Sequence, residues 1–94
     1  MTDYSKIKFE LKRQARFIYI KIEDLQARDP QRTNQQARNI AQCGITRCYV
    51  LIETAEVLAG ENIITREEYD EILEKVQIAH TRLIEINNEL IRED

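Results

Sequence analysis

Apolar residues recur every three or four positions along three separate stretches of the chain. This spacing places them on one side of an α-helix, because a helix completes one turn in about 3.6 residues. The pattern predicts an all-α fold, an antiparallel up-down-up bundle of three long helices at about residues 4–28, 31–59 and 65–92. The three apolar rows are Tyr4, Ile7, Leu11, Ala15, Ile18, Ile22 and Leu25; Ala37, Ala41, Gly44, Cys48, Leu51, Ala55 and Leu58; and Tyr69, Ile72, Val76, Ala79, Leu83, Ile86 and Leu90.

Local motifs mark the two turns between these helices. Pro30 is suited to the first turn of the second helix, which then begins near residue 31. Alternatively, Thr33 and the glutamine three residues later form a capping box, and the loop extends further. Gly60 is expected to end the second helix in a left-handed conformation. Thr65, with a glutamate three residues later, forms a second capping box and predicts the start of the third helix.

The composition agrees with a helical protein. Hydrophobic residues make up 43% of the chain and charged residues 33%, with only two glycines and one proline. A chain of 94 residues is expected to form one domain, residues 1–94, whose small core gains stability from oligomerisation. The N-terminus lacks the apolar stretch of a signal peptide, which predicts a cytoplasmic location.

Each helix carries a second set of apolar residues outside its main row. A three-helix bundle needs one apolar row per helix, so the additional residues indicate a surface that a partner covers, and self-association is the first candidate. The alternative is a wide core row with a few exposed neighbours. The third helix contributes Leu73, His80, Ile84 and Ile91 to this set. The candidate partner-binding residues are Phe9, Phe17, Ile20, Tyr49, Val50 and Val57.

Charge is unevenly distributed along the chain. Residues 1–50 carry a net charge of +5 and residues 51–94 carry −8. Lys8, Lys12 and Arg16 follow one another at intervals of four residues, with Tyr19 close behind. Such a flank is a candidate phosphate- or nucleotide-binding site, since the cations can hold phosphates and the ring can stack on a base. The alternative is that these cations pair with the acidic flank of the third helix or face water.

The two cysteines sit in a stretch rich in small residues. Cys43 and Cys48 are five positions apart on one helix and point about 140° away from each other, so they are not expected to form a disulfide. With a single histidine elsewhere, they do not supply the four ligands of a zinc site. We therefore interpret Gly44 and Cys48 as a close-packing seam, and we expect no metal, no cofactor and no enzymatic activity.

The segment IITREEYDEILEKVQIAHTRLIEINNEL, residues 63–90, shows the same heptad pattern as a known family of helices. It resembles the last helix of the small four-helix-bundle proteins found with ribosomal-RNA intervening sequences and diversity-generating retroelements. The resemblance covers less than a third of the chain. It implies a connection with nucleic acid.

Two functions follow as predictions. The first is a non-catalytic protein–protein interaction module, an adaptor, inhibitor or regulatory subunit, that acts as a homo-oligomer through the second apolar rows. The alternative is an accessory protein that binds nucleic acid or a nucleotide through its basic N-terminal half. No membrane association is expected, because the apolar runs are only a few residues long.

Overall fold

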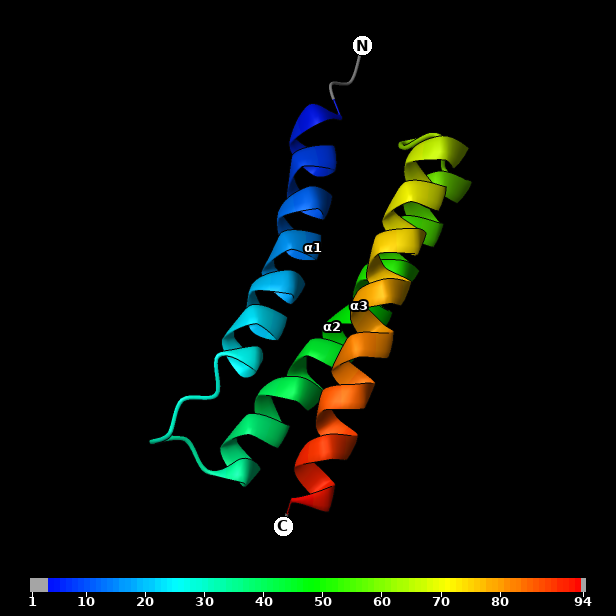
Figure 1. Ribbon diagram of the computed structural model, residues 1–94. Helices are drawn as coiled ribbons and strands as arrows, with labels where there is room; N and C mark the ends of the chain where they lie inside the picture. Colours follow the sequence, from blue (N-terminus) through cyan, green and yellow to red (C-terminus); the bar gives the residue numbers. More distant parts are fainter. Residues whose placement is uncertain (1–3, 94) are drawn as a thin grey trace.

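Three antiparallel helices make up the fold. The computed structural model describes residues 4–93, which contain α1 (Ser5–Gln26), α2 (Asn34–Gly60), α3 (Arg66–Arg92) and no strand. Figure 1 shows that the chain runs along the bundle in α1, returns in α2 and runs forward again in α3. Each helix contacts the other two, and the molecule measures 53 × 19 × 15 Å. The predicted all-α, up-down-up arrangement is therefore confirmed.

The core lies where the apolar rows of the three helices meet. Ile18, Cys48, Val76 and Leu83 are the largest fully buried side chains, and each helix contributes at least one of them. The centre of every predicted row is buried, whereas most residues at the ends of the rows are only half-buried, with the buried Leu25 as the exception. One member of the predicted core is wrong: Ile7 is 38% exposed. It belongs to the first turns of α1, beside one of the hollows described below.

The small residues of α2 form the seam that the sequence predicted. Ala41, Gly44, Cys48 and Ala55 are all buried. A Cβ atom placed on Gly44 would lie only 2.9 Å from Cδ1 of Leu83 on α3. Any larger residue at this position would therefore have to displace the Leu83 side chain, because the two helices approach each other closely.

The first turn corrects the predicted start of α2. The helix begins at Asn34 and not near residue 31, because Thr33 accepts a hydrogen bond from the Gln36 backbone N–H while the Gln36 side chain accepts one from the Thr33 N–H. Of the two alternatives, the capping box is correct. Pro30 lies in the preceding loop, where Asp29 accepts a hydrogen bond from the N–H of Gln31.

The second turn corrects the predicted end of α2. Gly60 was expected to adopt a left-handed conformation, but it is the last helical residue and its φ is not positive. Asn62, two residues later, has the positive φ of 61°. Asparagine reaches this region more easily than most residues, because its short polar side chain forms local hydrogen bonds. Thr65 and Glu68 then form the predicted capping box of α3, which is confirmed.

Candidate functional site

Two hollows accompany the N-terminal half of α1, one on each side. The α1/α3 groove has a volume of about 480 Å³ and the α1/α2 groove about 490 Å³. Leu11 lines both of them, although it is itself only 4% exposed. Around Leu11, α1 therefore touches the other two helices along a narrow strip and leaves open space on both sides.

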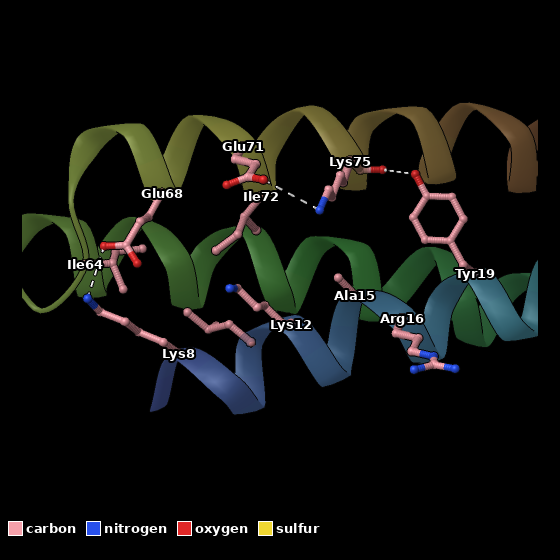
Figure 2. A pocket seen from close by; sticks show the side chains of 11 residues that line it. Lys8, Lys12, Ala15, Arg16, Tyr19, Ile64, Glu68, Glu71, Ile72 and Lys75 are labelled. Carbon is pink, nitrogen blue, oxygen red and sulfur yellow. Dashed lines mark hydrogen bonds and ion pairs between the residues drawn. The ribbon is translucent and has the colours of Figure 1, made fainter. Parts of the chain in front are cut away.

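Two polar contacts close the ends of the α1/α3 groove, as Figure 2 shows. At one end, Nζ of Lys8 lies 3.2 Å from a carboxylate oxygen of Glu68. At the other, the Tyr19 hydroxyl donates a 2.8 Å hydrogen bond to the backbone carbonyl of Lys75. Burial raises the pKa of Tyr19, which keeps the hydroxyl protonated as this bond requires. The floor between the two ends is apolar and consists of Leu11, Ala15, Ile64 and Ile72.

The walls of this groove carry an excess of positive charge. Glu68 pairs with Lys8, and its pKa is lowered by the Thr65 backbone N–H and by this lysine. Glu71 lies 3.7 Å from Lys75. Both acids of the groove are therefore matched by a cation within the chain.

Lys12 and Arg16 line the same groove, and their side chains form no ion pair or hydrogen bond with any part of residues 4–93. The groove therefore carries a net charge of about +2 after internal pairing. The four predicted phosphate-binding residues, Lys8, Lys12, Arg16 and Tyr19, all lie in this groove. Two of them are engaged within the chain and two are not.

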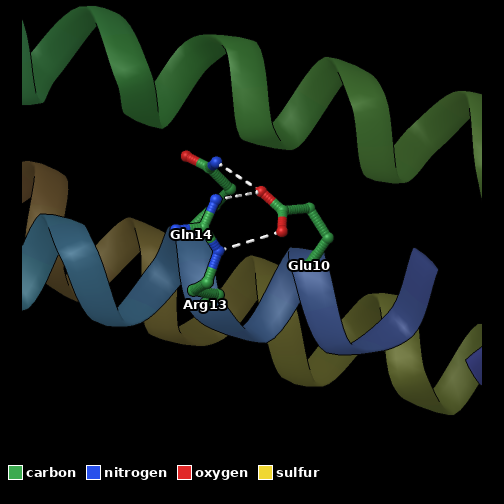
Figure 3. A network of polar contacts seen from close by, with 3 residues as sticks. All are labelled: Glu10, Arg13 and Gln14. Atoms are coloured by element: carbon green, nitrogen blue, oxygen red, sulfur yellow. Dashed lines mark hydrogen bonds and ion pairs between the residues drawn. The ribbon is translucent and has the colours of Figure 1, made fainter. Parts of the chain in front are cut away.

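The α1/α2 groove differs, because Glu10 and Gln14 on its rim bind each other within α1. Figure 3 shows Glu10 accepting hydrogen bonds from Arg13, at 2.7 and 2.9 Å, and from Gln14, at 2.8 Å. These contacts lower the pKa of Glu10 to about 2, mainly through the Arg13 guanidinium. The Thr54 hydroxyl donates to the Val50 carbonyl. Arg47 also lines this groove, where its guanidinium lies over the Phe17 ring, and most of the remaining lining is apolar.

All six predicted partner-binding residues are exposed. Phe17 is the least exposed, because Lys21 of α1 and Arg47 of α2 lie over its ring, 5.0 and 4.8 Å from the centroid. Tyr49 contacts His80 of α3 edge to face, and its hydroxyl lies 3.1 Å from Nε2 of the histidine. The exposed fractions are 68% for Phe9, 41% for Phe17, 50% for Ile20, 55% for Tyr49, 57% for Val50 and 59% for Val57.

The sequence did not identify all of the exposed apolar surface. Ile78 of α3 is 58% exposed and lies outside both rows that were assigned to this helix. Its position on the side of the helix opposite both rows was the available signal, because an isoleucine that fits neither row of a helix has no core to enter. The two grooves left no signal in the sequence, since their width depends on how far α1 stands from its neighbours.

The described residues do not bring the sulfur and imidazole groups together as a chemical site. Cys43 is exposed, whereas Cys48 is buried in the core, where burial raises the pKa of its thiol to about 11. Within residues 4–93, no group of three or more His, Cys, Asp or Glu side chains is positioned to hold a metal ion. In the same range, no helix is both long and apolar enough to span a membrane.

Comparisons with protein-family models, curated proteins and solved structures give no match to this chain. The resemblance of residues 63–90 to the small four-helix-bundle family therefore gains no support from them.

Proposed function

We propose that this chain is a non-catalytic protein-interaction module that works as a homo-oligomer through apolar side chains on its helix surfaces. One observation carries the proposal: within residues 4–93, large hydrophobic side chains are exposed on all three helices. Single exposed apolar residues are ordinary, but rows of them on an elongated bundle favour a covered surface. They are Ile7, Phe9, Phe17, Ile20, Tyr49, Val50, Val57, Ile78, Ile84 and Ile91.

Light scattering on two paired variants tests the proposal. Phe9→Asp with Ile20→Asp, and Val50→Asp with Val57→Asp, each place two charges within an exposed apolar row. We expect at least one of these variants to lower the mass of the oligomer while helical circular dichroism is preserved. All four positions are at least half exposed, so the fold does not depend on them.

The matched control is Gln42→Asp with Asn88→Asp, which adds the same charge at exposed positions without removing apolar surface. Its mass should equal that of the parent. A parent protein that stays at 11.2 kDa at every concentration, or an oligomer whose mass neither apolar variant changes, would contradict the proposal.

A nucleic-acid or nucleotide binder is the second candidate, and the unpaired Lys12 and Arg16 favour it. A labelled single-stranded oligonucleotide, titrated at increasing salt, tests this candidate. Binding that weakens steeply with salt and is lost in a Lys12→Ala/Arg16→Ala variant would support it. No binding at low salt would remove it.

A further inference from the structure

The α1/α3 groove needs an occupant with both apolar and acidic groups. Its floor is apolar, and its walls carry two cations, Lys12 and Arg16, that no acid within residues 4–93 neutralises. The groove runs from Lys8 to Tyr19 along α1, which corresponds to about 16 Å of helix at ~1.5 Å per residue. The groove is thus about three helical turns long, and an apolar surface that carries an acid and covers part of this length would match it.

An exposed row of α2 has this character, and Val50 at its edge also lines the α1/α2 groove. Val50, Glu53 and Val57 follow one another at intervals of three and four residues, so they form one row, here called the α2 ridge. All three are exposed, and Glu53 forms no ion pair with residues 4–93. The ridge is about 10 Å long, shorter than the groove. The neighbouring Thr54 hydroxyl already donates to the Val50 carbonyl, so burying the ridge leaves no donor there unsatisfied.

The ridge and the groove lie at the same level along the bundle. Arg47 of α2 lies over Phe17 of α1, and the Tyr69 hydroxyl of α3 lies 3.4 Å from Glu56 of α2. The C-terminal half of α2 is therefore level with the first half of α1 and the first turns of α3, which form the groove. Two copies lying side by side in the same orientation would bring a ridge to a groove without any shift along their axes.

We propose that the α1/α3 groove of one chain binds the α2 ridge of a second copy, an inference that rests on the proposed homo-oligomer. The ridge helix is antiparallel to α1 and α3 in its own chain, so in this arrangement it is also antiparallel to α1 and α3 of its neighbour. It completes an up-down-up-down four-helix arrangement, in which Val50 and Val57 cover the apolar floor and Glu53 faces Lys12 and Arg16. Because two different surfaces meet, the contact is head-to-tail and builds a ring or a chain of subunits.

Charge reversal on each side tests this contact. Glu53→Lys alters only the ridge, and Lys12→Glu with Arg16→Glu alters only the groove. Each variant alone should have a mass near the 11.2 kDa of one chain in light scattering, because like charges then meet across the contact. Mixed in equal amounts, the two variants should recover an assembly of at least two chains, since one supplies an intact groove and the other an intact ridge. Glu23→Lys and Arg92→Glu, at exposed positions outside both surfaces, are the charge controls and should keep the parental mass.

The outcomes separate this inference from the proposed function. A parental oligomer that persists in both charge-reversed variants, but dissociates in Phe9→Asp/Ile20→Asp, would overturn the ridge-and-groove contact and leave the homo-oligomer intact. A parent that is monomeric at every concentration would remove both. If the Lys12→Glu/Arg16→Glu variant keeps the parental oligomer mass but no longer binds the oligonucleotide, the ridge-and-groove contact is overturned and the groove is assigned to a polyanion. Circular dichroism shows whether each variant is folded, and recovery in the mixture excludes loss of folding as the cause of dissociation.

Discussion

Replacing Gly44 by leucine measures how closely α2 and α3 pack. A Cβ atom at this position would lie 2.9 Å from Cδ1 and 3.3 Å from Cδ2 of Leu83, whereas carbon atoms prefer separations of about 3.5–4.0 Å. Leu83 is fully buried, so its side chain cannot move away into solvent. Leucine favours the helical backbone by about 1 kcal/mol relative to glycine. Overpacking of a core costs about 1–3 kcal/mol, and a whole leucine side chain belongs at or above the upper end of that range.

We therefore expect Gly44→Leu to lower the free energy of unfolding by about 2 kcal/mol and the melting temperature by roughly 8–16 °C for a domain of this size. Thermal unfolding followed by circular dichroism measures the change. Gly60→Leu is the control, because a Cβ there meets no atom within 4 Å, and its melting temperature should change little. In a Leu83→Ala background, which makes room for the new side chain, the loss should become smaller. A Gly44→Leu protein that melts above the parent, or an equal loss in both backgrounds, would refute the close contact.

Four further predictions follow from single residues and contacts. A thiol reagent should label the exposed Cys43 well before the buried Cys48, and equal rates would contradict the assigned faces of α2. Burial raises the Cys48 pKa from about 9 to about 11, so the unfolded chain loses its thiol proton first; the free energy of unfolding should fall as pH rises from about 9 to 11, and this fall should shrink in Cys48→Ala. Thr65→Ala should cost about 1 kcal/mol in urea unfolding by removing the cap of α3, whereas Thr65→Ser should retain most of it. Tyr19→Phe should cost about 0.5–1.5 kcal/mol through loss of the bond to the Lys75 carbonyl, and unchanged stability would mean that the bond is not formed in solution.

The sequence was sufficient to predict the three helices because their signals are local and periodic. Residues spaced like Val76, Ala79, Leu83 and Ile86 can all face one core only if the segment is helical. These four residues are buried as predicted. The capping box at Thr65 needs only residues within one turn of helix. Where two local signals competed, as at Pro30 and Thr33, the sequence left both starts open and the capping box determined the boundary.

The grooves could not be predicted, because they depend on distances between helices. The row on α1 includes Ile7 by its spacing, yet this residue is 38% exposed beside the α1/α2 groove. Likewise, intervals of four residues place Lys8, Lys12 and Arg16 on one flank of α1. Only the distance across to α3 determines that Lys8 reaches Glu68 while the other two cations reach no acid within the described chain.

Opposite net charges on α1 and α3 are not sufficient to close the α1/α3 groove. Counted over their bounds, α1 carries +3, α2 carries 0 and α3 carries −3. This charge difference favours approach of α1 and α3, but exposed charges separated by more than about 8 Å are largely screened at physiological salt. Such screened attraction does not close a space that the side chains between two helices are too small to fill. Ala15, on the groove floor, is one of these small side chains. Filling the space requires apolar volume from elsewhere, and matching the walls requires an acid near Lys12 and Arg16. If the proposed contact forms, a helix surface that supplies both would stabilise the bundle beside α1, and we expect the packing of α1, rather than that of the α2–α3 pair, to respond to it.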